Sequence, residues 1–141
     1  MKNTLKEIGL ELIPYPTDDY FAKNTNQGWG CGYVKIPSGH PILIKIEMQS
    51  EFNLFNLYSN GFSNEITYAK WDKEGDYYKI GFDTRHTFND SSDDEAYVLK
   101  TTLKLKEIVE NYTFDDAKED IDLYIAELKE RLIDELNELE I

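Results

Sequence analysis

A chain of 141 residues is long enough for one domain with its own core and too short for two ordinary ones, so we expect a single domain over residues 1–141. Hydrophobic residues make up 40% of the chain and aromatic residues 13%, which excludes a disordered protein. The 28 acidic residues outnumber the 15 basic ones and leave a net charge of −13, which opposes direct binding of DNA or RNA unless the basic residues gather on one face.

Cysteine content and hydropathy indicate the compartment. Cys31 is the only cysteine, so the chain can form no internal disulfide and no zinc site built from several cysteines. The residues after Met1 lack the apolar core of a secretory signal, and no segment approaches the roughly 18 apolar residues of a membrane span. We therefore expect a cytoplasmic protein that is not inserted in a membrane.

The first half of the chain predicts one short helix and two strands. Leu5, Ile8 and Leu12 recur at helical spacing and predict a helix over residues 4–13. The glycine-rich segment 28–32 predicts a backbone that packs closely beside another element; a phosphate loop would need a helix to follow, and residues 33–37 alternate like a strand. Residues 42–48 are rich in β-branched side chains and predict a second strand.

The second half predicts a hairpin followed by two helices. Residues 49–64 mix aromatic and polar side chains at no single period, so helix and strand both stay open there. Residues 66–71 and 77–82 flank a polar loop with a glycine and predict a β-hairpin. Helical periodicity then predicts a helix from residue 93, capped by Ser92 or Asp93, to 111, and a second one from 113–116 to the end. The fold class is therefore α+β, a small antiparallel sheet packed by helices, with a long acidic C-terminal helix.

That last helix concentrates the charge. Residues 115–141 hold 11 acidic and three basic side chains, and their apolar residues form a seam close to that of a coiled coil. The acidic run fits a solvated face. It also fits a helix that presents its carboxylates to a basic partner, for which we expect Glu119, Asp122, Glu127, Glu130, Asp134 and Glu138 to supply the contacts.

A second candidate site follows the last predicted strand. Asp83, Arg85 and His86 stand at a strand end, and His40 stands in another turn, so the four residues could form one pocket. Two imidazoles and a carboxylate could hold a metal ion or carry out acid–base chemistry, and Arg85 could bind an anion. Ordinary roles in turns and ion pairs explain the same residues, and we expect no metal and no cofactor.

Two residue types have a structural and a functional explanation. Cys31 fits a small buried apolar residue better than a nucleophile, which would need a base nearby. The ten tyrosines are more than a domain of this size must bury, so part of the set could form a surface for binding another protein; among them are Tyr15, Tyr20, Tyr58, Tyr68, Tyr77 and Tyr78.

Four blocks of residues appear in the order of a known pattern. They are 32–34 (GYV), 37–41 (PSGHP), 66–68 (ITY) and 80–86 (IGFDTRH), followed by a helix that contains tyrosine. Over residues 28–112 the chain resembles a family of small phage and prophage proteins, which implies a viral origin rather than an activity. Members of that family often carry His-Gly-Gly before the third block. This chain has Ser63, Asn64 and Glu65 there, which argues against a three-histidine metal site.

Taken with the acidic extension over 113–141, the resemblance implies a protein similar in kind to anti-CRISPR and other anti-defence proteins. We therefore expect a non-enzymatic protein that engages a basic host effector or ribonucleoprotein. The alternative is a nucleotide-binding sponge or hydrolase with its pocket at residues 83–86. A third interpretation is a homodimer held by the C-terminal seam.

Overall fold

The computed structural model describes residues 1–16, 27–50, 56–86 and 88–140. They belong to two compact units. The first unit comprises Met1–His40 and Phe55–Asn111, and the second comprises Pro41–Leu54 and Tyr112–Ile141. The single domain expected from chain length stays a prediction.

The first unit is built on a four-stranded antiparallel sheet. Its strands are β1 (Leu10–Pro14), β2 (Gly30–Pro37), β3 (Tyr68–Trp71) and β4 (Tyr77–Phe82), in the spatial order β1-β2-β4-β3. The predicted strand at 33–37 and the predicted hairpin are confirmed, with β3 and β4 paired from Tyr68 opposite Gly81 to Trp71 opposite Tyr78. The fold class is α+β, as predicted.

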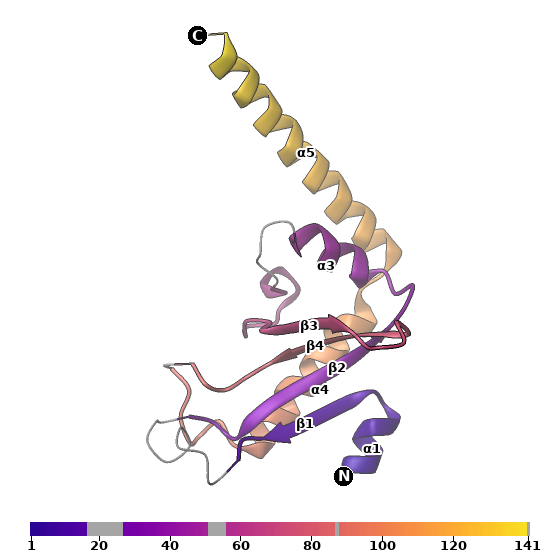
Figure 1. The fold of residues 1–141 in the computed structure, drawn as a ribbon, viewed down its shortest axis with the longest axis vertical. Helices are drawn as coiled ribbons and strands as arrows, with labels where there is room; N and C mark the ends of the chain where they lie inside the picture. Colours follow the sequence, from indigo (N-terminus) through magenta and orange to yellow (C-terminus); the bar gives the residue numbers. More distant parts are fainter. Residues whose placement is uncertain (17–26, 51–55, 87, 141) are drawn as a thin grey trace. The chain divides into compact units, whose positions relative to one another are not determined.

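One helix, α4 (Glu95–Asn111), covers one face of this sheet (Figure 1). Its buried side chains recur at helical spacing, which is why the segment folds as an amphipathic helix. α4 packs on β2 and on β1. Alternate residues of β2 and of its neighbour β4 are buried on this face, so the core lies between α4 and the sheet; its members include Val34, Ile36, Ile80, Phe82, Val98, Thr102 and Leu105. The Phe82 ring also packs edge-on against Phe62, with 5.7 Å between the ring centres.

Close packing explains the glycine-rich segment. A methyl group on Gly32 would lie 2.0 Å from the hydroxyl of Thr102 on α4, and one on Gly28 would lie 2.5 Å from Thr84. No side chain fits in either place. The prediction of a close backbone approach is confirmed.

The helix predicted over residues 4–13 is wrong in its second half. α1 (Lys2–Glu7) is followed by Gly9 in the left-handed region (φ +78°), and the chain then continues as β1. Few residues other than glycine adopt this backbone conformation, so the helix ends there. The spacing of Leu5, Ile8 and Leu12 suits both structures over so short a run.

The N-terminal cap predicted for α4 is also displaced by one residue. The carboxylate of Asp94 accepts a hydrogen bond from the backbone N–H of Tyr97 at 2.9 Å, which is the capping contact. Asp93 instead accepts hydrogen bonds from the side chain of Asn89 and the backbone of Asp90. It therefore holds the preceding turn rather than the helix.

The second unit pairs two helices, and one of them was predicted as a strand. α3 (Ile42–Ser50) is helical because Pro41 accepts a hydrogen bond from the Ile44 N–H in its first turn, and because Ile42 and Ile46 are both buried at a spacing of four. Three β-branched isoleucines over seven residues favoured a strand locally, but packing overrides such propensities.

α5 (Phe114–Leu139) is the predicted C-terminal helix. Thr113 and Asp116 form a capping box, in which each side chain accepts a hydrogen bond from the other residue's backbone N–H. Lys45 of α3 pairs with Asp120 of α5 at 3.8 Å, and Tyr112 donates a hydrogen bond to the same carboxylate. Figure 1 shows α3 beside the first part of α5. Among the described residues, no helix is long and apolar enough to cross a membrane.

Within the segment 49–64, which the sequence left open, Asn56 pairs with Glu65 in an isolated bridge and a 3-10 turn forms at η1 (Tyr58–Asn60). Residues 49–50 belong to α3. Residues 51–55 lie outside the described residues.

Candidate functional site

The turn after β4 is organised by Thr84, which is fully buried. Its hydroxyl donates a hydrogen bond to the Gly30 carbonyl at 2.8 Å and accepts one from the Gly30 N–H at 3.2 Å. Its backbone N–H donates to the Tyr15 hydroxyl at 2.9 Å, and its carbonyl accepts from the Gly28 N–H at 2.8 Å. Thr84 therefore joins the turn to both ends of the loop between β1 and β2.

This turn brings three of the four predicted pocket residues together. His86 Nε2 lies 3.3 Å from Asp83 Oδ1, which also accepts a hydrogen bond from the Arg85 N–H. The His86 ring stacks on Phe88 with 5.1 Å between centres, and the Arg85 guanidinium lies 3.9 Å from the centre of the Tyr15 ring. The contact between Asp83 and His86 was an open possibility in the sequence.

His40 lies at the other end of the sheet, so the four-residue pocket is wrong. β2 and β4 pair from Gly32 opposite Phe82 to Pro37 opposite Tyr77, which places Asp83 beyond one end of this ladder and His40 beyond the other. About six residues of extended strand, roughly 20 Å, separate the two positions. Burial lowers the pKa of His40 from its usual value of 6.5. Among the described residues, no three histidine, cysteine or acidic side chains gather to hold a metal ion.

Tyr15 links the turn to Cys31. Its hydroxyl accepts hydrogen bonds from Thr84 and, at 3.8 Å, from the half-buried Cys31 thiol, and burial raises the pKa of Tyr15 from 10.0 to about 12. Because the folded state holds the proton more tightly than the unfolded state, this group stabilises the fold fully below pH 10, and the contribution is lost as the pH rises to 12.

We therefore expect the wild-type protein to lose stability relative to Tyr15→Phe between about pH 10 and pH 12. Urea unfolding followed by circular dichroism at about pH 8, 10 and 11.5 measures the difference in unfolding free energy between the two proteins. Tyr58→Phe, at an exposed tyrosine, should keep the wild-type pH dependence. A wild-type to Tyr15→Phe difference that stays constant with pH would contradict the assignment.

The six predicted partner-binding carboxylates all lie on α5 with exposed side chains. At about 3.6 residues per turn, Glu119, Glu127, Glu130, Asp134 and Glu138 fall on one side of the helix, with Asp122 at its margin. The apolar seam falls on the opposite side. Its last members, Leu132, Leu136 and Leu139, are 64%, 55% and 83% exposed. Carboxylates and leucines therefore form two separate surfaces along the same helix.

A further surface lies on the face of the sheet opposite α4. Residues directly opposite one another in antiparallel strands point to the same face. Lys35 of β2 lies opposite Lys79 of β4, which lies opposite Lys70 of β3, so three lysines stand abreast across three strands. Three lysines and three tyrosines on this side of the sheet form what we call the lysine–tyrosine face: Tyr33, Lys35, Tyr68, Lys70, Tyr77 and Lys79.

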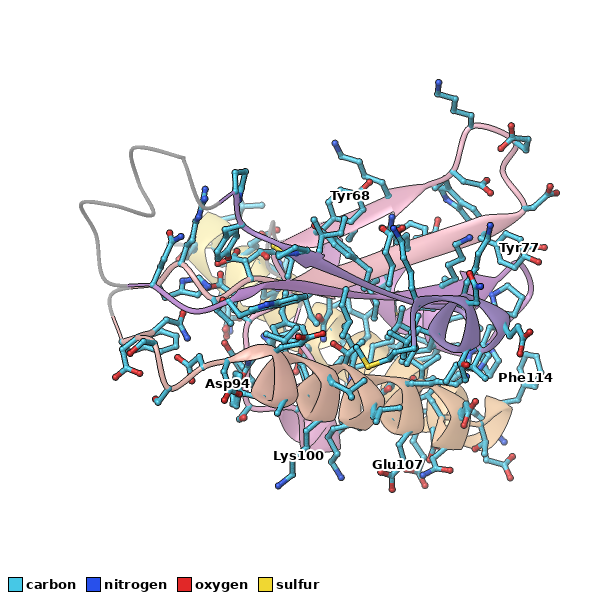
Figure 2. The ribbon with its side chains drawn as sticks, turned by 90° about the horizontal axis from the view of Figure 1, so that it is seen from below. Tyr68, Tyr77, Asp94, Lys100, Glu107 and Phe114 are labelled. Atoms are coloured by element: carbon cyan, nitrogen blue, oxygen red, sulfur yellow. The ribbon has the colours of Figure 1, made fainter. Side chains whose placement is uncertain are left out.

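Contacts among these residues couple the lysines to the rings. The Tyr33 and Tyr68 rings meet edge to face at 5.3 Å, and Lys79 Nζ lies 4.7 Å from the centre of Tyr33 and 5.9 Å from that of Tyr68. Lys70 lies 5.5 Å from the Tyr68 ring, and Lys35 lies 5.6 Å from the Tyr77 ring. In Figure 2, Tyr68 lies on the side of the sheet turned away from α4, while Lys100 and Glu107 point outward from α4.

Gly81 makes room for this arrangement. A methyl group at Gly81 would lie 2.4 Å from the Tyr33 ring, so the ring rests directly on the backbone of β4. Tyr33 is half-buried in consequence, and burial raises its pKa above the usual value. Any side chain at position 81 would displace the ring. The sequence IGF in the 80–86 block therefore serves the sheet face as well as the turn.

Tyr68 and Tyr77 of this face were singled out from the sequence, but Tyr33 and the lysines that accompany the rings were missed. The signal was alternation: lysine and tyrosine occupy every second position of residues 33–35, 68–70 and 77–79. Only the strand register places these pairs side by side. Tyr78 belongs to the other face, where its ring packs edge-on against Trp71 at 5.2 Å. Tyr20 lies outside the described residues.

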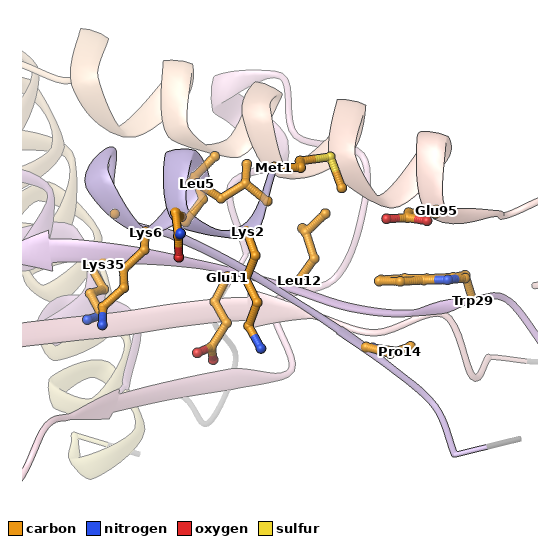
Figure 3. Close-up of a pocket in the computed structure, with 13 residues that line it drawn as sticks. Met1, Lys2, Leu5, Lys6, Glu11, Leu12, Pro14, Trp29, Lys35 and Glu95 are labelled. Carbon is orange, nitrogen blue, oxygen red and sulfur yellow. The ribbon is translucent and has the colours of Figure 1, made fainter. Parts of the chain in front are cut away.

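A groove of about 460 Å³ adjoins this face at the β1 edge. Lys6 and Lys35 line one end of it, and Trp29 and Glu95 line the other (Figure 3). Lys35 belongs to both the groove and the lysine–tyrosine face. None of the four predicted pocket residues is among the described residues that line the groove.

Comparison with known protein families, with curated proteins and with solved structures finds no match to this chain. Its function must therefore be inferred from the chemistry of α5, with its carboxylate and leucine surfaces, and of the lysine–tyrosine face.

Proposed function

We propose that this is a non-enzymatic binding protein, phage-encoded and anti-defence in kind, that acts in the host cytoplasm by engaging a basic, nucleic-acid-binding host protein through α5. The observation that carries the proposal is the exposure of the two surfaces along the C-terminal half of this helix. A solvated helix needs carboxylates but not leucines that are more than half exposed. The exposed leucines support a docking role.

Charge directs this proposal toward a basic partner. Eleven of the 28 acidic residues lie in residues 115–141, against three of the 15 basic ones. Carboxylates arrayed on one side of a helix attract a basic surface and accelerate encounter with it, and they repel another acidic protein. The resemblance to small phage proteins supports the phage origin in this proposal. The acidic side of α5 supports the basic partner, because a protein that occupies a nucleic-acid groove must present an anionic surface to it.

A homodimer through the leucine seam is the second candidate function. The seam lies opposite the carboxylates, so two copies could pair through their leucines and still present both acidic surfaces outward. Sedimentation velocity of the full chain over a range of concentrations decides whether two copies pair. Pairing would add a second acidic surface to each assembly without changing the proposed partner.

The test of the acidic surface is charge reversal. We expect E127K/E130K/D134K to weaken binding to the basic partner at least about tenfold, because close charge pairs in such interfaces contribute about 1.5 kcal/mol or more each. Tagged protein is used to capture host proteins from a bacterial lysate at low and high salt, and a captured nucleic-acid-binding protein is then purified and its Kd measured. The matched control is E7K/E74K/E107K, which makes the same change in net charge at exposed positions that are not part of α5.

Three results would contradict the proposal. The first is a captured partner that both triple variants bind equally well, because charge at α5 would then carry no specificity. The second is binding that persists in high salt after the reversal at residues 127, 130 and 134. The third is a captured protein of acidic or neutral surface.

A further inference from the structure

The lysine–tyrosine face holds a row of like charges that the fold itself does not require. Lys35, Lys79 and Lys70 are direct cross-strand neighbours, and neighbouring strands are about 5 Å apart, so each pair of like charges destabilises the sheet. Glu11 of β1 pairs with Lys79 at 2.8 Å and offsets one of the three. Lys35 and Lys70 are both exposed. A bound polyanion would relieve the repulsion that remains.

The tyrosines give the same surface flat apolar rings. Tyr33 and Tyr68 are half-buried and Tyr77 is 44% exposed, so all three rings are accessible in part beside the lysines. Nucleobases stack on aromatic side chains of this kind, and lysines beside the rings bind the phosphates that join the bases. Inorganic anions or carboxylates would use the lysines alone and leave the rings without a role.

The basic area continues beyond the sheet. The adjoining groove is lined by Lys2 and Lys6 of α1 and by Lys35, against Glu11 and Glu95, so its charged side chains are basic by three to two and carry the positive charge to the β1 edge. The net charge of −13 opposes nucleic-acid binding only while the basic residues are dispersed. On this side of the first unit, lysines are gathered. Two rows of residues cross the strands here, Glu11–Tyr33–Gly81–Tyr68 and Lys35–Lys79–Lys70, and Glu11 is their acidic member.

We propose that the lysine–tyrosine face binds single-stranded nucleic acid, with phosphates on the lysine row and bases stacked on the tyrosine rings. This site shares no residue with α5 and goes beyond the proposed function. An open, four-stranded antiparallel sheet offers a flat platform on which successive bases can lie, whereas a duplex hides its bases from such a surface. The lysines and rings read no base edge, so binding tolerates many sequences.

The test uses the full chain and fluorescence anisotropy with labelled oligouridylate and oligothymidylate of about 12 nucleotides at low salt. We expect K35E/K70E to weaken binding of either oligonucleotide more than about tenfold and to reduce the slope of log K against log salt by about 1.4, about 0.7 for each lost phosphate contact. The matched control K100E/K104E reverses two exposed lysines on α4 and should change binding less than about twofold. Tyr77→Ala should weaken binding about tenfold and the exposed control Tyr58→Ala should not.

Several results would overturn the site. The first is that the wild type binds neither oligonucleotide. The second is that K35E/K70E and K100E/K104E lose the same amount of oligonucleotide affinity. The third is that polyglutamate of equal charge displaces the oligonucleotide. The last would indicate an acidic protein segment as the ligand. A preference for the RNA probe over the DNA probe would support the site and assign contacts to the 2′-hydroxyl, and equal binding would support it with contacts restricted to phosphates and bases.

Folding of the variants does not limit the test. In the wild-type chain, two-dimensional NMR with oligouridylate should shift the amide signals of Tyr33, Lys70 and Lys79 and leave those of Lys100 and Lys104 in place. Shifts confined to residues outside the lysine–tyrosine face and the groove would also overturn the site. Loss of α5 function in the charge-reversal experiment leaves these shifts unchanged, so the two proposals fail independently.

Discussion

Replacing Phe82 by alanine is expected to lower the free energy of unfolding by about 3–5 kcal/mol, the usual cost of truncating a fully buried phenylalanine. The side chain is 1% exposed, packs edge-on against Phe62 and lies against the position where Gly32 faces Thr102. Surrounding groups include backbone and a buried threonine, which cannot move in to fill the space. Urea unfolding followed by circular dichroism measures the loss.

The matched control is Phe88→Ala, at a phenylalanine that is 74% exposed and stacks on His86. Its effect on stability should stay within about 0.5 kcal/mol, as for other surface substitutions. A loss below about 1.5 kcal/mol for Phe82→Ala would show that the core between α4 and the sheet can collapse around the cavity.

Replacing Thr84 by valine should cost about 2–3 kcal/mol although the side chain keeps its volume. The hydroxyl serves both the N–H and the carbonyl of Gly30 in a buried position, and valine leaves both groups without that partner. The turn that carries Asp83, Arg85 and His86 should loosen at the same time. Chemical denaturation gives the energy, and the NMR signals of the His86 ring report the turn.

Thr84→Ser separates the hydrogen bonds from the methyl group. Serine keeps the hydroxyl and should recover most of the stability lost in Thr84→Val, less the small contribution of one buried methyl. If the serine and valine variants are equally destabilised, packing of the methyl group rather than hydrogen bonding holds the turn.

The elements that were predicted correctly from the sequence have either a long apolar repeat or a strand partner that is close in the sequence. α4 and α5 each repeat an apolar face over several turns, and the β3–β4 hairpin is joined by a short polar loop. The errors fell on short segments. Residues 10–13 suit helix and strand about equally over so short a run, and Gly9 ends the helix before them. Residues 42–48 favour a strand locally, and packing overrides that preference.

The same division holds for the candidate site. The acidic residues of α5 could be predicted because they lie on one continuous helix. Asp83 and His86 are three residues apart, so their contact was within reach of the sequence. The lysine–tyrosine face was not, since Lys35 and Lys70 become neighbours of Lys79 only through pairing with β4 in one register. A shift of one residue would move every one of these side chains to the opposite face.

The order of the strands restricts how this protein can associate. β1 and β3 are the two edges of the sheet, and an edge with free backbone groups invites the addition of a strand from another molecule. β1 ends at Pro14, which has no N–H to donate, and β3 is only four residues long and carries Lys70. Both edges are therefore poor templates for growth into fibrils. The exposed leucines of α5 can bring two molecules together, but the sheet then offers no edge on which amyloid strands would add.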